Sequence, residues 1–74
     1  MQKRSLTIAG HRTSIALEAE FWSGLEALAA AEHLHLTELI RRLDQTRGGP
    51  NLTSALRIAV LDFYRSGTAF KAAE

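Results

Sequence analysis

Apolar and polar positions alternate along residues 11–18, whose sequence is HRTSIALE. The two alternating sets are Thr13, Ile15 and Leu17, and Arg12, Ser14 and Ala16. A repeat of two residues is typical of a β-strand whose two faces meet different surroundings. We therefore predict a strand over residues 11–17, with Ile15 and Leu17 against the core and the second set facing solvent.

The first ten residues, MQKRSLTIAG, also alternate, with Leu6 and Ile8 as the apolar positions. Gly10 interrupts this pattern, as a bend or a bulge does. We predict that residues 1–10 form a basic N-terminal arm, which either is extended and leads into the strand or is disordered at its tip. Only residues 11–17 are predicted as a strand, so a strand partner has to come from elsewhere.

Three later segments carry apolar residues at the three- and four-residue spacing of amphipathic helices. They cover about residues 19–32, 36–46 and 52–65. His35 takes the N-cap position of the second helix, and Asn51 is a favourable N-cap for the third. The RGGP stretch at 47–50 ends the second helix. We predict a loose tail over residues 67–74.

The apolar faces of these segments define a predicted core, part of which we expect at a dimer contact. Its members are Ile15, Leu17, Phe21, Trp22, Leu25, Leu36, Leu39, Ile40, Leu43, Leu56, Val60 and Phe63. The third helix is apolar around most of its circumference, so we expect it to be buried on more than one side.

Length and cysteine content favour a second copy of the chain. The chain has 74 residues and no cysteine, so no disulfide stabilises its small core. A single strand also leaves both its edges unpaired. Two copies related by a two-fold axis would solve both problems by pairing their strands antiparallel. The predicted fold is mainly α with one β-strand, and the homodimer has an intermolecular two-stranded ribbon and an additional C-terminal helix.

Charge is distributed unevenly, although the net charge is only +1. Lys3, Arg4 and Arg12 lie within the first 17 residues, and the first acidic residue is Glu18. A basic arm beside a strand can be a nucleic-acid footprint. Three cations are few, so charge alone favours a solvated terminus. Both interpretations stay open.

Two stretches resemble a known family: TIAGHRTSIALE at 7–18 and PNLTSALR at 50–57. Together with a helix that opens with EFW and a later LTELI, they resemble the ribbon-helix-helix superfamily of MetJ- and Arc-like DNA-binding proteins, and most closely a short bacterial subfamily. The resemblance covers about residues 4–65. Residues 52–65 also resemble a second helix of this fold, but the short connection after the first helix favours 36–46.

The resemblance implies a DNA-binding site. It implies base-reading residues on the strand and phosphate-binding residues on the arm and at the start of the second helix: Arg12, Ser14 and Ala16, and Lys3, Arg4, His35 and Thr37. The guanidinium of Arg12 can hydrogen-bond the edge of a guanine, whereas the hydroxyl of Ser14 discriminates only weakly between bases. Alanine departs from the polar residue usual at its position, and it can contact only a thymine methyl group.

Other chemistries find no support in the sequence. His33 and His35 are two residues apart, but nothing nearby completes a metal site. No nucleophile is paired with a base, so we expect no enzyme, no cofactor and no metal. No apolar run reaches the roughly 18 residues of a membrane span, and no signal peptide is evident. We expect a cytoplasmic protein.

The leading hypothesis is a homodimeric, sequence-specific DNA-binding protein that regulates transcription by inserting a β-ribbon in the major groove. The alternative is a protein–protein interaction module, antitoxin-like or a signalling adaptor, with weak or no DNA binding and a protein partner on residues 52–64. A nonspecific nucleoid protein fits poorly with a net charge of +1.

Overall fold

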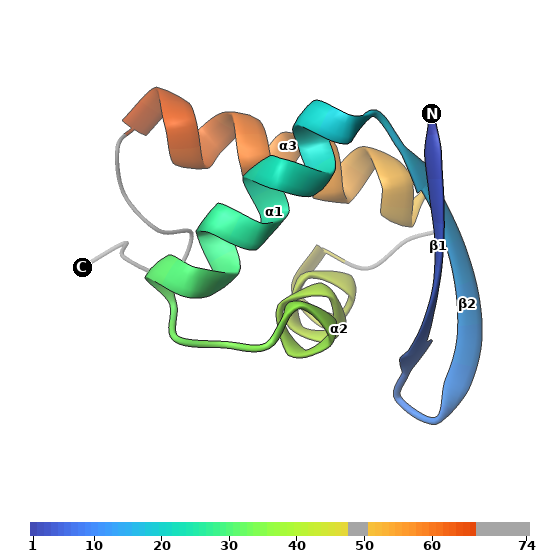
Figure 1. The fold of residues 1–74 in the computed structure, drawn as a ribbon. Helices are drawn as coiled ribbons and strands as arrows, with labels where there is room; N and C mark the ends of the chain where they lie inside the picture. The colour runs from blue at the N-terminus through green and yellow to red at the C-terminus, as the bar shows by residue number, and fades with distance from the viewer. Residues whose placement is uncertain (48–50, 67–74) are drawn as a thin grey trace.

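The computed structural model describes residues 1–47 and 51–66, which form a two-stranded ribbon followed by three helices (Figure 1). The elements in order are β1 (Gln2–Ile8), β2 (His11–Leu17), α1 (Ala19–Ala31), α2 (Leu36–Arg47) and α3 (Leu52–Ser66). α2 ends at Arg47, within one residue of the predicted end at 46. Residues 48–50 of the RGGP stretch and the predicted loose tail at 67–74 lie outside the described residues. Across 1–47 and 51–66, no helix has the length and apolar content needed to cross a membrane.

The ribbon is an antiparallel hairpin made by one chain, in which Gln2 pairs with Leu17 and Ile8 with His11. Ala9 and Gly10 form the connecting turn, with φ angles of 53° and 83°. Two consecutive residues with positive φ are the signature of the type I′ turn, whose twist matches that of the strands it joins. Gly10 therefore belongs to a tight turn rather than to a bulge.

This hairpin corrects the prediction of a single strand with an intermolecular partner. Residues 2–8, expected as an arm, are a full strand and pair with β2 within the chain. The apolar positions are even-numbered before the turn, at Leu6 and Ile8, and odd-numbered after it, at Ile15 and Leu17. Across a two-residue turn, even-numbered residues of the first strand lie on the same face as odd-numbered residues of the second. The apolar residues of both strands therefore share one face, and the chain supplies its own second strand.

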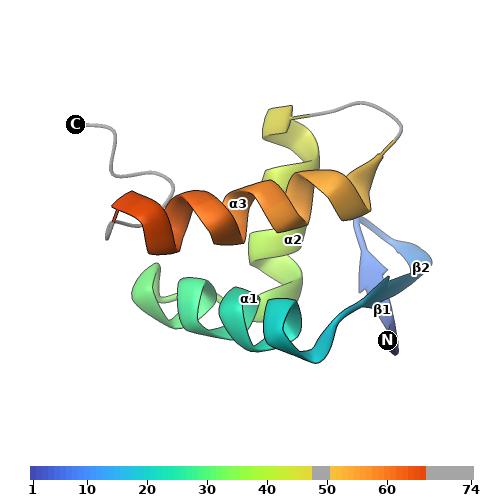
Figure 2. The ribbon, with the colours of Figure 1, turned by 90° about the horizontal axis from the view of Figure 1, so that it is seen from above.

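The ribbon packs across one end of the helices, as both ribbon views show (Figures 1 and 2). The first turns of α1 and α3 lie at the ribbon end, and the last turn of α3 lies at the far end. α2 crosses beneath the pair formed by α1 and α3 in Figure 2. The core fills the space enclosed by the three helices and the inner face of the ribbon.

Most of the predicted core is buried inside a single chain. The buried members are Ile15, Leu17, Trp22, Leu25, Leu39, Ile40, Leu43, Leu56 and Val60. Phe21, Leu36 and Phe63 are only partly buried and pack at the margin of this core. Ile8, from the segment expected as an arm, joins the core with 6% of its surface exposed. The core therefore forms without a second copy of the chain.

Local signals set the helix ends. Asn51 caps α3 as predicted, because its Oδ1 accepts a hydrogen bond from the Ser54 amide at 3.0 Å. His33 lies two residues after the last residue of α1 and has a φ of 59°. The amides of His33 and Leu34 donate to the carbonyls of Ala30 and Ala29, which is the Schellman pattern of hydrogen bonds.

Candidate nucleic-acid interface

The face of the ribbon that points away from the helices is polar and carries two cations. It consists of Lys3, Ser5 and Thr7 from β1, and Arg12, Ser14 and Ala16 from β2. All six side chains are exposed, and we call this set the outer face of the ribbon. Residues 1–17 contain no acidic residue, so the outer face carries no negative charge. Such a surface favours a polyanionic partner.

The three strand residues expected to read bases all lie on the outer face. Arg12, Ser14 and Ala16 are exposed, whereas Ile15 and Leu17 between and beside them are buried. The predicted orientation of the strand is therefore confirmed, and the reading role itself stays a prediction. Among residues 1–47 and 51–66, no ion pair engages Arg12, so its guanidinium is available to a ligand.

Sequence reasoning missed the contribution of β1 to this face. Ser5 and Ser14 are directly opposite each other, and their hydroxyl oxygens are 3.2 Å apart. Lys3 and Thr7 flank Ser5 on the same face, because alternate residues of a strand point to the same side. The signal was present in the sequence as the even-numbered alternation that ends at Ile8.

Arg4, expected beside Lys3 as a phosphate ligand, is engaged on the inner side of the ribbon. Its Nη1 lies 3.0 Å from Oε2 of Glu26, and its guanidinium carbon lies 4.6 Å from the centre of the Trp22 ring. The indole Nε1 of Trp22 donates to the carbonyl oxygen of Gln2 at 2.9 Å. Arg4 and Trp22 thus attach β1 to α1, and the two neighbouring cations of the ribbon have different surroundings.

The start of α2 holds the other two residues expected to bind phosphate. His35 precedes the helix and is exposed, and Thr37 in its first turn is partly buried. The amides of a first helical turn and the helix dipole favour an anion. Nothing in the structure tests phosphate binding at either residue, so both remain predictions.

Glu38 makes the shortest ion pair of α2. Its carboxylate accepts hydrogen bonds from Nη2 of Arg41 at 2.6 Å and from Nε of Arg42 at 3.0 Å. These bonds, with Arg41 contributing most, lower the pKa of Glu38 to about 2. Both arginines are therefore paired within their own helix, whereas Lys3 and Arg12 of the outer face have no carboxylate partner among the described residues.

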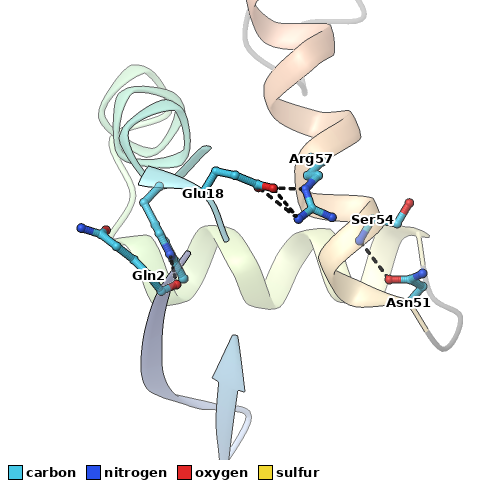
Figure 3. Close-up of polar contacts among 6 residues, drawn as sticks. Gln2, Glu18, Asn51, Ser54 and Arg57 are labelled. Carbon is cyan, nitrogen blue, oxygen red and sulfur yellow. Dashed lines mark hydrogen bonds and ion pairs between the residues drawn. The ribbon is translucent and has the colours of Figure 1, made fainter. Parts of the chain in front are cut away.

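A second ion pair joins the end of the ribbon to α3 (Figure 3). Glu18 follows β2 directly, and its carboxylate accepts bonds from Nε and Nη2 of Arg57 at 3.2 and 3.0 Å. Hydrogen bonding by the backbone of Glu18, and next by Arg57, lowers the pKa of this carboxyl. The contact links the junction of β2 and α1 to α3, and it compensates the negative charge of the first acidic residue after the ribbon.

α3 has two different apolar faces. Ala55, Leu56, Ala59 and Val60 are buried against the other helices. On the solvent side Ile58, Leu61 and Tyr64 expose 42%, 54% and 60% of their surface, and we call these three the α3 stripe. The expectation of burial on more than one side is not met within one chain.

Comparisons with known proteins agree with this arrangement. A family model for the ribbon-helix-helix domain matches residues 1–64. Among solved structures, an uncharacterized protein from Bordetella pertussis Tohama I is similar, with a TM-score of 0.77 and 34% sequence identity. The match covers 99% of this chain and 70% of that one. A search of curated proteins found no match.

The family match sets the coarse function. Ribbon-helix-helix domains are non-enzymatic folds that generally bind DNA as transcription regulators, and they typically form dimers. The match covers both strands, α1, α2 and nearly all of α3. The chain therefore belongs to the ribbon-helix-helix family.

Proposed function

We propose that this protein binds double-stranded DNA sequence-specifically through the outer face of its ribbon and acts as a transcriptional regulator. The observation that carries the proposal is the exposed, acid-free outer face, with Ser14 at its centre and Arg12 near one end. A two-stranded ribbon fits the major groove, which is about 12 Å wide. The Arg12 guanidinium can donate two hydrogen bonds to the O6 and N7 atoms of guanine.

Selection from a pool of random-sequence duplexes tests this proposal, because the operator need not be known. We expect the wild-type chain to enrich a discrete motif, and we expect Arg12→Ala to weaken binding to the enriched duplex by about 1–3 kcal/mol. Arg65→Ala is the matched control, since Arg65 is an exposed arginine in the last turn of α3, far from the ribbon. A wild-type chain that enriches no motif contradicts the proposal.

The homodimer is part of the same proposal. Because β2 finds its partner within the chain, an unpaired strand no longer requires a second copy. Ribbon-helix-helix proteins typically form dimers, and the α3 stripe leaves three large apolar side chains in water. Both observations favour a dimer. We place the proposed dimer contact on this stripe. Each chain of such a dimer carries a complete ribbon.

Sedimentation equilibrium across protein concentrations tests the dimer. Leu61→Glu should shift the equilibrium toward the single chain, because burial of a carboxylate in an apolar contact is costly. Ala27→Glu, which adds the same charge at an exposed position of α1, is the control. A wild-type chain that stays single at every concentration contradicts the dimer.

The α3 stripe also supports a second candidate function, a protein–protein interaction module with a partner on residues 52–64. The two candidates separate experimentally. A module of this kind would enrich no DNA motif, and Arg12→Ala would leave its partner binding unchanged while Leu61→Glu would abolish it. If the protein is a DNA-binding regulator, the wild-type chain enriches a motif and Arg12→Ala weakens binding to it.

A further inference from the structure

The two strands of the ribbon carry the same order of side-chain types on the outer face. β1 presents Lys3, Ser5 and Thr7, and β2 presents Arg12, Ser14 and Ala16. Each strand therefore offers a cation, then a serine, then a small residue that ends in a methyl group. The offset between corresponding residues is nine throughout, as the sequence numbers give directly.

The strand register turns this repeat into a pseudo-two-fold symmetry. Ser5 is paired with Ser14, so a two-fold axis through this pair, perpendicular to the ribbon, exchanges the two serines. The same rotation carries Lys3 to the place of Arg12, and Thr7 to the place of Ala16. On the inner face Leu6 corresponds to Ile15 and Ile8 to Leu17, whereas Arg4 corresponds to Thr13 and departs from the relation.

A two-fold face of this kind is what a ribbon shared by two identical chains would present. Here one chain builds it alone, and β1 is held in place at two points. The Ser5 and Ser14 hydroxyls lie 3.2 Å apart at the pseudo-axis. The Trp22 indole donates to the Gln2 carbonyl at 2.9 Å at the open end of the hairpin. β1 is thus anchored at its centre and at its beginning.

We propose that a single chain is the complete DNA-reading unit, and that Lys3, Ser5 and Thr7 of β1 are base-contacting equivalents of Arg12, Ser14 and Ala16. This inference rests on the proposed function and extends it to β1. Lys3 and Arg12 lie at opposite ends and on opposite strands of the outer face. Four residues along a strand span about 13 Å, close to the roughly 12 Å width of the major groove.

The chemistry of the face defines the class of DNA site. Lysine and arginine both donate hydrogen bonds to the O6 and N7 acceptors of guanine. A serine hydroxyl can bond to either kind of base pair, and the methyl groups of threonine and alanine can contact the methyl group of thymine. The preferred site is therefore a short, approximately palindromic element with one guanine on each side of its centre. One ribbon from one chain occupies it.

Cysteine pairing tests whether one chain forms the ribbon, and it needs no DNA. The chain contains no cysteine, so any disulfide that forms must involve the introduced thiols. After oxidation with diamide, Ser5→Cys/Ser14→Cys should close a disulfide within the chain, seen by mass spectrometry and as faster migration on a non-reducing gel. Ser14→Cys alone should form covalent dimers no faster than Ala27→Cys, whose thiol is exposed on α1. A Ser14→Cys dimer that forms much faster than the Ala27→Cys dimer would overturn the proposal, because it would show two β2 strands paired with each other.

Selection from random-sequence duplexes then tests the reading role of β1. We expect Lys3→Ala to lose preference at one side of the wild-type motif, Arg12→Ala at the other side, and each to lower affinity for that motif about tenfold or more. Arg65→Ala should retain the motif. If Arg12→Ala alters the motif and Lys3→Ala does not, this inference fails while DNA binding stands. If the wild-type chain enriches nothing, the proposed function fails with it.

Discussion

The guanidinium of Arg57 binds the carboxylate of Glu18 across 39 positions of sequence, with its Nη2 3.0 Å from Oε1 and 3.2 Å from Oε2 (Figure 3). Glu18 is the residue where β2 passes into α1, and its carbonyl accepts the first hydrogen bonds of that helix from Phe21 and Trp22. The ion pair therefore joins the ribbon, α1 and α3 at one point.

Acid should destabilise the fold through Glu18 and Glu38. The pKa of each carboxyl lies below its ordinary value of 4.5, and that of Glu38 is about 2. The native state therefore binds fewer protons than the unfolded state in this range. The stabilisation is complete above about pH 4.5 and is lost as the pH falls toward 2. Urea midpoints measured at a series of pH values should decline over this window.

Two substitutions separate the contributions to this acid sensitivity. Arg57→Met should raise the pKa of Glu18 toward its ordinary value, because the guanidinium bonds are lost while its backbone hydrogen bond remains. Glu38→Gln should remove the part of the decline closest to pH 2. Carboxyl carbon chemical shifts of Glu18 and Glu38 report both titrations. A Glu18 pKa that does not move in Arg57→Met would contradict the assignment.

His33→Gly should stabilise the protein by about 1 kcal/mol, because a left-handed φ costs a non-glycine residue roughly 1–2 kcal/mol. His33 has a φ of 59° at the end of α1 and is exposed, so no packing is lost. Ala30→Gly is the control, because the same loss of side chain within the helix should destabilise by about 0.5–1 kcal/mol. Opposite signs in chemical denaturation are the expected result.

The turn of the hairpin should respond in opposite directions at its two residues. Ala9→Asn creates an Asn-Gly turn, and it should stabilise the hairpin by about 1 kcal/mol because asparagine tolerates positive φ better than alanine. Gly10→Ala should destabilise by about 1–2 kcal/mol. No heavy atom lies within 4 Å of a Cβ added at Gly10, so the loss would come from the backbone alone. Amide exchange rates in β1 and β2 measure both changes.

Gly24→Ala should destabilise by about 1–3 kcal/mol, which is typical of overpacking a core. Gly24 is buried where α1 approaches α3, and an added Cβ would lie 2.5 Å from Cγ1 of Val60. Val60→Ala in the Gly24→Ala background should relieve the clash. The double variant should therefore lose less unfolding free energy than the sum of the losses of the two single variants. Thermal unfolding of the four chains gives the coupling, and strict additivity would contradict this account.

Much of the helical part of this fold could be predicted from sequence, because the signals there are local. The predicted spans 19–32, 36–46 and 52–65 differ from the observed helices by one residue at an end. Asn51 acts as the predicted cap because capping depends only on residues three positions apart. The orientation of β2, with Ile15 inward and Arg12 outward, followed from its two-residue period.

The strand that pairs with β2 was harder to predict, because strand pairing depends on which other segments of the chain lie beside β2. The change from even to odd apolar positions across Ala9 and Gly10 was in the sequence, but the turn lacked the usual Asn-Gly or Asp-Gly signal. Only the folded chain showed that Ala9 adopts the positive φ that closes the hairpin. Residues 2–8 are therefore a strand of the hairpin and not an arm.

The sequence by itself determined which residues face inward or outward and where the helices begin and end, because periodicity and capping act over a few residues. Tertiary structure decided which elements meet. It placed Arg4 over Trp22 and against Glu26, and so removed one cation from the surface that Lys3 still shares. It also brought Ser5 opposite Ser14. The contacts of Arg4 depend on packing between segments that are distant in the sequence, which no local pattern of side chains specifies. The pairing of the two serines depends on a turn that lacks the usual Asn-Gly or Asp-Gly signal.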